Sequence, residues 1–304
     1  MYSKKEESQI RNLERESFRK LKTEENKNKK VPISDDILYI SDFILEKFPN
    51  SGDSGDLYLA TNKHNHNEKY ILKHEYYDCA CNEYMYSKFG NKMGIKIAPV
   101  KLFVLDDKKS KFKSDFVCGI KYLENCQHVS FNYIEENKTS INNWKDYFKM
   151  LCLELLFEEG DGIEVVKYKN ELYRLDTTDA FTISDFYIHP LAYDYNNNGI
   201  NIKEFAKKII LQMAKGNTDS RISSWESDVN YFLEKFGNKY LNYYLETYQL
   251  LENVSDEEID EWISILTFFY PNVIGEYFKI YFSNLKLDVK KFLIKMDKKD
   301  LVGV

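Results

Sequence analysis

The chain has 304 residues, 43% of them hydrophobic and 15% aromatic, so it can bury a substantial core and is long enough for two lobes. Its 43 Lys and Arg against 49 Asp and Glu are interspersed and sum to -6, which argues against direct binding of nucleic acid or an anionic membrane. The five cysteines form no CxxC pairs, and no apolar run approaches the roughly 18 residues of a membrane span. We therefore expect a cytoplasmic protein with reduced thiols and neither secretion nor a membrane partner.

Residues 1–36 are mostly charged or polar and predict an exposed helical extension. Residues 37–125 predict a β-rich region, because short runs of apolar, β-branched and aromatic residues alternate with turn residues. The predicted strands are 43–45, 56–61, 69–73, 99–105 and 116–120. One helix over 81–92 interrupts them, with Gly94 as its C-terminal stop.

From about residue 141 the apolar period becomes helical, apart from a short hairpin over 162–179. The predicted helices are 144–156, 202–213, 225–236, 240–251, 256–270 and 274–282. Ser255 followed by Glu258 is a capping-box pattern and predicts a defined start for the helix at 256. Aromatic residues recur at helical spacing in this region, which favours a packed core over a stacking platform.

The segment Gly52-Asp53-Ser54-Gly55 lies between two extended apolar stretches and can form a tight hairpin whose backbone N–H groups face phosphate oxygens. Alone, the same residues are more typical of an ordinary β-turn. Lys73 ends the next apolar strand, and Glu83 lies near the start of the following helix, where it can partner a partly buried ammonium. This order favours the nucleotide-binding interpretation.

A nucleotide site of this kind also needs carboxylates that hold Mg²⁺. Asp176 follows an apolar strand and enters a turn, with Asp179 just beyond, which suits a metal-binding pair. The other interpretation is an aspartate that ends the strand and caps the next turn. Asp161, in the segment before the hairpin, is placed to orient a hydroxyl acceptor. The predicted fold is therefore α+β, a bilobal protein-kinase-like fold with a small β-rich N-lobe (37–125) that carries one helix and a larger, mainly helical C-lobe (126–304).

The order of these motifs resembles the HipA-type atypical kinases, relatives of the phosphoinositide kinases, over about residues 40–185. The motifs that carry the resemblance are Ser51-Gly52-Asp53-Ser54-Gly55, Tyr70-Ile71-Leu72-Lys73, Asn82-Glu83-Tyr84, Gly94-Ile95-Lys96-Ile97-Ala98-Pro99, Gly119-Ile120-Lys121-Tyr122-Leu123, Asp161-Gly162 and Leu175-Asp176.

The resemblance implies an ATP- and Mg²⁺-dependent kinase that phosphorylates Ser or Thr of a protein substrate, and such kinases frequently act as toxins beside an antitoxin-like partner. It implies that the segment Gly52 to Gly55 covers the phosphates, that Lys73 binds them and that Glu83 pairs with Lys73. It further implies that Asp161 is the catalytic-loop aspartate and that Asp176 holds Mg²⁺. The adenine pocket would be lined by Ile120, Lys121, Tyr122 and Leu123. The richness in Asn, Lys, Ile and Tyr indicates AT-rich coding, as in a low-GC bacterium or its phage.

One departure from the family is substantial. In the family the catalytic aspartate is followed by a His and then by an Asn that holds a second metal, whereas Gly162-Ile163-Glu164-Val165-Val166 follows Asp161 here. Either a nearby glutamate, Glu158, Glu159 or Glu164, compensates, or phosphotransfer is lost. The alternatives are a nucleotide-binding pseudokinase that serves as a protein-interaction module, a different transfer such as adenylylation, and a fold that binds no nucleotide.

Two further patterns point to metals and are weaker. The segment Asp194 to Glu204 nearly matches an EF-hand loop, but Glu204 falls one position before the bidentate carboxylate, which favours a polar loop. His64 and His66 lie on a predicted hairpin tip without Cys or carboxylate neighbours, which favours a surface turn over a zinc site.

Overall fold

A computed structural model describes residues 22–49, 57–73, 77–106, 112, 116–159, 162–178, 180–182 and 214–298. The chain divides into two compact units. The β-rich unit comprises Pro32–Met150 and Gly160–Ala180, and the helical unit comprises Met1–Val31, Leu151–Glu159 and Phe181–Val304. The predicted lobe boundaries, at 37–125 and 126–304, remain predictions, because these units are defined by compactness alone.

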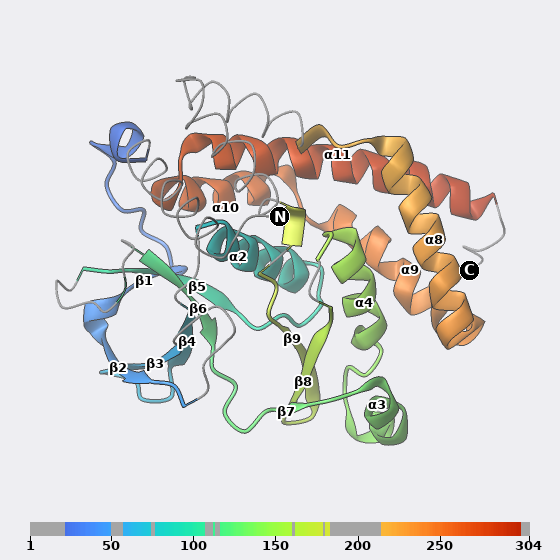
Figure 1. Cartoon of the computed structure of the whole chain (residues 1–304), viewed down its shortest axis with the longest axis horizontal. Coiled ribbons are helices and arrows are strands. Elements are labelled where there is room, and N and C mark those ends of the chain that lie inside the picture. Colours follow the sequence, from blue (N-terminus) through green and yellow to red (C-terminus); the bar gives the residue numbers. More distant parts are fainter. Residues whose placement is uncertain are drawn as a thin grey trace, which may run out of the picture. The chain divides into compact units, whose positions relative to one another are not determined.

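The β-rich unit contains a curled six-stranded sheet in the order β1-β5-β6-β4-β3-β2 (Figure 1). Its strands are β1 (Ile37–Tyr39), β2 (Phe43–Lys47), β3 (Leu57–Asn62), β4 (Lys69–Lys73), β5 (Val100–Val104) and β6 (Phe116–Lys121). All pairings are antiparallel except β1 with β5. Gly119 lets β6 approach its neighbours closely, since a Cβ there would lie 2.4 Å from the Phe103 ring.

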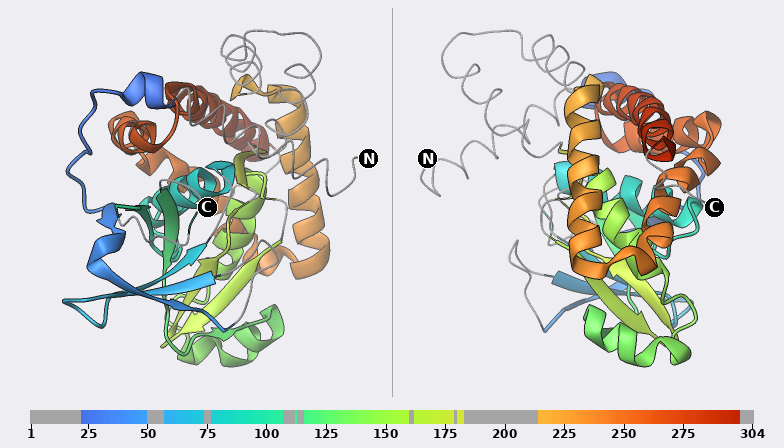
Figure 2. Two further views of the ribbon diagram at one scale, coloured as in Figure 1. Left: turned by 60° about the vertical axis from the view of Figure 1, so that its left-hand side comes forward. Right: turned by 90° about the vertical axis from the view of Figure 1, so that its right-hand side faces the viewer.

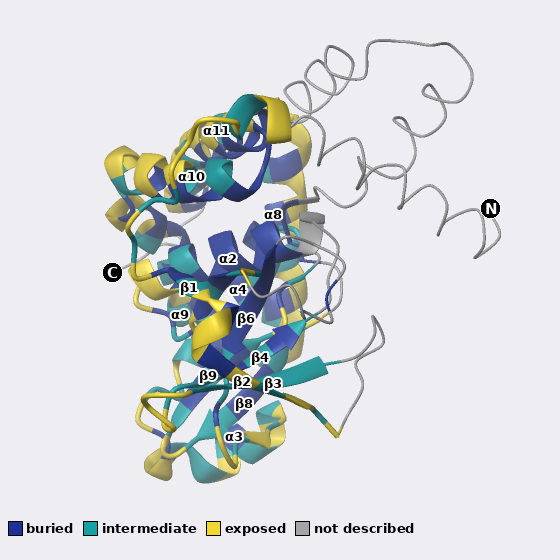
Figure 3. Ribbon diagram, turned by 90° about the vertical axis from the view of Figure 1, so that its left-hand side faces the viewer, coloured by how far each residue is buried: buried dark blue, intermediate teal, exposed yellow. Residues whose placement is uncertain are grey.

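The helix α2 (Tyr77–Lys92) packs against β5 and β6. It begins before the predicted residue 81 and ends as predicted, with Gly94 in the left-handed region at φ 79°. Every residue from Ala80 to Ser87 is buried, as the dark blue of α2 in Figure 3 shows. Polar residues in this stretch must therefore find partners inside the protein.

A second sheet in the order β7-β8-β9 completes the β-rich unit. Its strands are β7 (Gln127–His128), β8 (Glu164–Tyr168) and β9 (Glu171–Leu175). The hairpin predicted over 162–179 is therefore present as β8 and β9, joined by a tight turn with Lys169 at φ 57°. Two helices accompany this sheet in the chain, α3 (Phe131–Asn137) and α4 (Asp146–Leu156), the latter running on into the helical unit.

In the described part of the helical unit there are four further α-helices, and α11 packs against α8, α9 and α10 (Figure 2). They are α8 (Thr218–Phe236), α9 (Leu241–Leu250), α10 (Asp256–Phe269) and α11 (Asn272–Asp297). Short 3-10 helices occur in both units: η1 (Ile40–Asp42), η2 (Lys138–Ser140), η3 (Ala180–Thr182), η4 (Asn238–Tyr240) and η5 (Leu251–Asn253). The capping box predicted for α10 is present, with Ser255 Oγ accepting from Glu258 N at 3.2 Å. The helix predicted over 202–213 lies outside the described residues.

The predicted aromatic core is confirmed for most of its members. Tyr277 stacks on Tyr281, and Phe278 on Phe282, one turn further along α11. The helix continues well past the predicted end at 282, because buried apolar residues keep the helical period among the lysines that obscure it. These residues are Leu285, Val289, Phe292 and Met296. Among the described residues, no helix has the length and apolar content to span a bilayer.

A buried ion pair joins α8 to α11. Arg221 Nη1 lies 2.7 Å from Asp288 Oδ2, and both side chains are under one-tenth exposed. Thr218 Oγ1 donates to the other oxygen of the same carboxylate at 2.8 Å. Burial removes the hydration of both charges, so these contacts are needed to offset the desolvation cost.

We expect Asp288→Asn to lower the free energy of unfolding by about 3 kcal/mol, because the buried Arg221 guanidinium would lose its closer counter-ion and keep the Glu158 carboxylate at 3.6 Å. The matched control is Asp260→Asn, whose partner Lys279 is 60% exposed, and it should cost less than about 1 kcal/mol. Urea denaturation of both variants checks this. Equal costs for the two variants would contradict the assigned role of the buried pair.

Candidate functional site

Three charged side chains from distant parts of the sequence meet within the β-rich unit. Lys73 Nζ, at the end of β4, lies 2.6 Å from Glu83 Oε1 on α2 and 2.7 Å from Asp176 Oδ1 after β9. The Lys73 side chain is only 12% exposed, so a nearly buried ammonium is shared between two carboxylates. The structure thus brings together three of the residues that the order of motifs places in one site.

Glu83 is the most deeply buried member of the cluster, with 2% of its side chain exposed. Besides Lys73, its two oxygens accept from Thr177 Oγ1 at 3.3 Å and contact Thr178 Oγ1 at 3.2 Å. The neighbouring Asn82 Nδ2 donates to the carbonyl of Thr178 at 2.8 Å. The turn of α2 that carries Glu83 is therefore bound directly to the segment after β9.

Asp176 combines an exposed carboxylate with an unusual backbone. Its φ of 48° lies in the left-handed region, which Asp tolerates better than most residues. Its side chain is 49% exposed, and Oδ1 accepts from Lys73 and, at 2.6 Å, from Thr178 Oγ1. Oδ2 accepts no hydrogen bond in the described part of the chain.

The protonation of Asp176 is set by two opposing effects. Desolvation by the surrounding protein disfavours the charged form and would by itself raise the pKa of this carboxyl. The Lys73 ammonium and the hydrogen bonds from Lys73 and Thr178 outweigh that effect and hold the pKa below its ordinary value. Asp176 is therefore an anion at neutral pH.

The two threonines were not predicted as site residues. A signal for them exists in the segment Leu175-Asp176-Thr177-Thr178, where consecutive hydroxyls directly follow the end of an apolar strand. Buried hydroxyls need partners, and Thr177 is 1% exposed. Their contact with Glu83 still could not be derived, because it joins residues about a hundred positions apart.

A second buried carboxylate, from a segment that precedes α2 in the chain, also holds this helix in place. Asp36 precedes β1, is 7% exposed, and accepts from Tyr84 Oη and Lys101 Nζ, each at 3.0 Å. It also contacts the Lys88 ammonium. Since Tyr84 and Lys88 lie on α2 beside Glu83, Asp36 helps to set the position of the helix that carries Glu83.

Residues predicted to line an adenine pocket lie at and beyond the end of β6. The backbone N–H of Lys121 donates to Pro99, and that of Tyr122 donates to Lys69 at 3.0 Å. The Lys121 ammonium lies over the Tyr70 ring, and burial lowers the pKa of this lysine. Leu123 is buried. These residues lie in the same β-rich unit as Lys73, Glu83 and Asp176.

Several predicted site residues lie outside the described residues. They are Gly52, Asp53, Ser54, Gly55, Asp161 and Asp179, together with the EF-hand-like segment 194–204. His64 and His66 are exposed on the turn between β3 and β4.

The donor set around Lys73 suits a nucleotide with its metal. An ammonium held at the end of a strand can bind phosphate oxygens, and a carboxylate oxygen with no hydrogen bond is the kind of ligand Mg²⁺ takes. Within the described ranges no three His, Cys, Asp or Glu side chains converge on one point, so Asp176 would need further ligands from water, phosphate or other parts of the chain.

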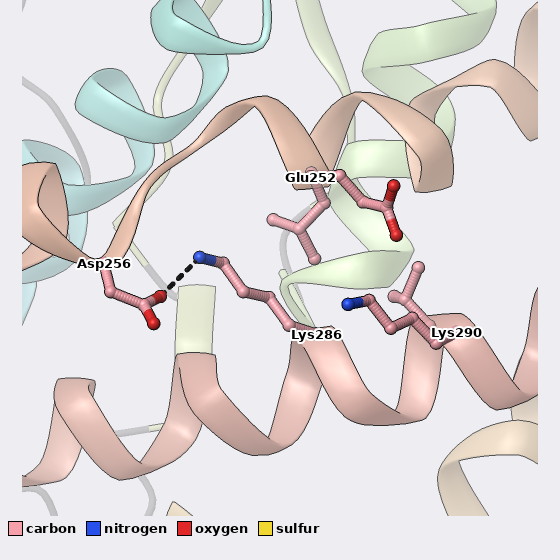
Figure 4. Close-up of a pocket in the computed structure, with 6 residues that line it drawn as sticks. Glu252, Asp256, Lys286 and Lys290 are labelled. Carbon is pink, nitrogen blue, oxygen red and sulfur yellow. Dashed lines mark hydrogen bonds and ion pairs between the residues drawn. The ribbon is translucent and has the colours of Figure 1, made fainter.

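A small hollow in the helical unit has different chemistry (Figure 4). It measures about 340 Å³ and lies between η5 and α11. Lys286 points into it and donates to Asp256 Oδ1 and to the Val254 carbonyl, each at 2.6 Å. Lys290, Glu252 and Asp256 also line the hollow, so acidic and basic side chains are mixed there and no single sign of charge dominates it.

We expect Asp36→Asn to lower the melting temperature at pH 7, since Lys88 and Lys101 would lose their shared counter-ion. Burial would raise the Asp36 pKa, but the two ammonium groups hold it below its ordinary value. A lowered folded-state pKa adds stability above the unfolded-state pKa, and this stability is lost as pH falls through the folded-state pKa. The difference between wild type and variant should therefore shrink below about pH 4.

Circular dichroism melts between about pH 7 and pH 3 measure this difference. Asp35→Asn is the matched control, because the neighbouring Asp35 is exposed and should change the melting temperature little. A gap between wild type and Asp36→Asn that widens on acidification would contradict the assignment.

Comparison with known proteins shows the fold. No protein-family model matches the chain, and no curated protein resembles it in sequence. A solved structure of CtkA, a proinflammatory kinase from Helicobacter pylori, matches 86% of this chain and 98% of its own with a TM-score of 0.53 and 12% sequence identity. The predicted fold class is therefore confirmed: this is an α+β protein with a kinase-like fold.

Proposed function

We propose that the chain is an ATP- and Mg²⁺-dependent phosphotransferase and, more narrowly, a HipA-like protein Ser/Thr kinase. The observation that carries this proposal is the contact of Lys73 with both Glu83 and Asp176 on a kinase-like fold. A buried pair of Lys and Glu by itself would need no role beyond stabilising the fold. A half-exposed aspartate on the same ammonium, with one oxygen that accepts no hydrogen bond from the residues the structure describes, is better explained by a site for phosphate and a cation.

Each residue would have a separate task in the reaction. Lys73 would bind and orient the phosphates, because Glu83 keeps its ammonium at the end of β4. Thr177 and Thr178 would hold Glu83 and the segment around Asp176 in one arrangement. Asp176 and Asp179 would hold Mg²⁺, which supplies charge neutralisation at the phosphates. Asp161 would orient the hydroxyl of the acceptor.

The finer parts of the proposal rest on the order of motifs in the sequence. That order supports a protein Ser or Thr as acceptor, a cytoplasmic location and a toxin paired with an antitoxin-like partner. The interspersed charges of a chain with net charge -6 agree with a protein partner rather than nucleic acid.

A second candidate is a nucleotide-binding pseudokinase that acts as an interaction module. The observation that favours it is the segment Gly162-Ile163-Glu164-Val165-Val166 after Asp161, which contains neither the His that directly follows the aspartate in the resembling family nor the Asn further along. Such a protein would keep the Lys73 cluster and bind nucleotide without turning it over.

Phosphoryl transfer is tested by incubating the protein with Mg²⁺, a mixed lysate and ATP labelled at the γ-phosphate. We expect wild type to label itself or a substrate, and Lys73→Met and Asp176→Asn each to lose about 100-fold or more, because each removes a charge that faces the phosphates or the metal. Asn is preferred to Ala at 176 because it tolerates the left-handed backbone. Lys63→Met, in the turn after β3, is the control and should keep full activity.

Equal labelling by wild type, Lys73→Met and Asp176→Asn would contradict the assignment of Lys73 and Asp176 to phosphoryl transfer. Transfer from α-labelled instead of γ-labelled ATP would identify the reaction as adenylylation.

Thermal unfolding with Mg-ATP separates the kinase from the pseudokinase when it is read beside turnover. Ligand at about 100 times its dissociation constant should stabilise the folded protein by about 2.7 kcal/mol, and Lys73→Met should reduce the shift. A shift without phosphoryl transfer identifies the pseudokinase. No shift with ATP or GTP at millimolar concentration would argue against both candidates.

A further inference from the structure

Arg174 is a fully buried arginine one residue before the end of β9, with 0% of its surface exposed. Its backbone N–H donates to the Lys96 carbonyl and its carbonyl accepts from Ala98 N, each at 3.0 Å. On the other edge of β9 it pairs with Val165 of β8. The strand is therefore held on both sides, and the direction of the Arg174 side chain is fixed by the sheet.

The guanidinium of Arg174 binds backbone carbonyls and no carboxylate. Nη2 donates to the Gly162 carbonyl at 3.0 Å, while Nη1 donates to the Glu164 carbonyl at 3.3 Å and to the Leu175 carbonyl. Within the described part of the chain Arg174 has no ion pair, and its Nε has no partner. A buried cation with this set of partners is costly for stability, and an apolar side chain of similar volume would fill the space at lower cost.

Two of the three carbonyls that Arg174 binds belong to residues next to the two predicted catalytic aspartates. Gly162 directly follows Asp161, and Leu175 directly precedes Asp176. Consecutive Cα atoms are about 3.8 Å apart, so fixing the Leu175 carbonyl limits where Asp176 can lie, and Gly162 is the residue through which Arg174 would act on Asp161. The rigid planar fork of an arginine suits this task, because it can address several carbonyls at once.

Backbone conformation gives an independent reason for such a restraint. Gly162 has a φ of 86° and Asp176 a φ of 48°, so both ends of the hairpin leave it in the left-handed region. A non-glycine residue keeps such a conformation only where surrounding contacts impose it. The bond from Arg174 to the Leu175 carbonyl is one of these contacts.

We propose that Arg174 is a positioning residue that fixes the segment after Asp161 against the strand end that carries Asp176. The inference rests on the proposed phosphotransferase function, in which both aspartates act on the same phosphoryl group. Arg174 touches no substrate in this role. It acts through backbone carbonyls, in a loop that lacks the His and Asn of the resembling family.

Phosphoryl transfer depends mainly on positioning, and a misplacement of about 1 Å can cost about 100-fold in rate. Because the Arg174 guanidinium binds backbone carbonyls and would touch no substrate, the change should appear in kcat and leave the KM for ATP nearly unaltered. A purely structural arginine would lower the amount of folded enzyme and would not act selectively on one segment.

The experiment compares Arg174→Lys and Arg174→Met with Leu172→Ala. Leu172 is the matched control, because it is also 0% exposed and lies two residues earlier on the same face of β9. Arg174→Lys keeps the positive charge but loses the planar guanidinium that can donate to several carbonyls at once. It also provides a folded variant if Arg174→Met is unstable. All proteins are assayed as full chains below their melting temperatures, by hydrogen exchange followed by mass spectrometry and by kcat and KM for Mg-ATP.

In Arg174→Lys we expect amides in peptides covering 160–166 to exchange about tenfold faster, while peptides of β4 and α2 stay at the wild-type rate. We expect kcat to fall at least about tenfold, with the KM for ATP within about twofold. Leu172→Ala should not show this selective pattern. Wild-type exchange at 160–166 in Arg174→Lys, or the same pattern and kcat loss in Leu172→Ala, would overturn the proposal.

Failure of the proposed function has a separate signature. If wild type transfers no phosphate, the phosphotransferase proposal fails, and hydrogen exchange alone decides whether Arg174 positions the segment. If wild type is active and Arg174→Lys keeps its kcat, the function stands and the role of Arg174 falls.

Discussion

The burial of the Glu83 carboxylate is the constraint on which the site depends. A carboxylate that is 2% exposed in an almost fully buried helix must be matched by cations and hydroxyls, or its desolvation would destabilise the fold. The partners come from β4 through Lys73 and from the end of β9 through Thr177 and Thr178. Satisfying this one group therefore brings three elements together and leaves Asp176 beside the same ammonium. The grouping of these charged side chains therefore follows from the need of one buried carboxylate for partners in the folded state.

Much of this arrangement could be predicted from the sequence, and what escaped prediction has a common cause. Lys73 ends β4 and Asp176 directly follows β9, while Glu83 lies inside α2, and their order along the chain limits what they can meet. Asp36 and Arg174 carry no such signal. Asp36 resembles an ordinary turn residue before a strand, although it is tied to α2 and β5. Arg174 binds backbone carbonyls, which every residue possesses and no sequence pattern reveals.

Local conformation at the ends of the β8–β9 hairpin also depends on long-range contacts. Asp176 adopts a left-handed backbone that Asp tolerates but does not by itself enforce. Thr178 fixes its carboxylate, and Arg174 fixes the carbonyl just before it. The position of the carboxylate is therefore determined by contacts on both sides of the residue. Loosening either contact would alter the direction of Oδ2 while leaving the charge of Asp176 in place.

Charge balance explains why a buried arginine can lie so close to this site without an ion pair of its own. Lys73 alone cannot neutralise both Glu83 and Asp176, and Arg174 supplies a second positive charge that helps to lower the pKa of Asp176. Two cations and two anions then share one region of the β-rich unit, and each cation is held by protein groups on a fixed strand. A triphosphate entering beside Lys73 would add negative charge to a balanced cluster. Under the proposed function the nucleotide would therefore arrive with its own cation, and the Asp176 oxygen that accepts no hydrogen bond within the described residues would be a ligand for it.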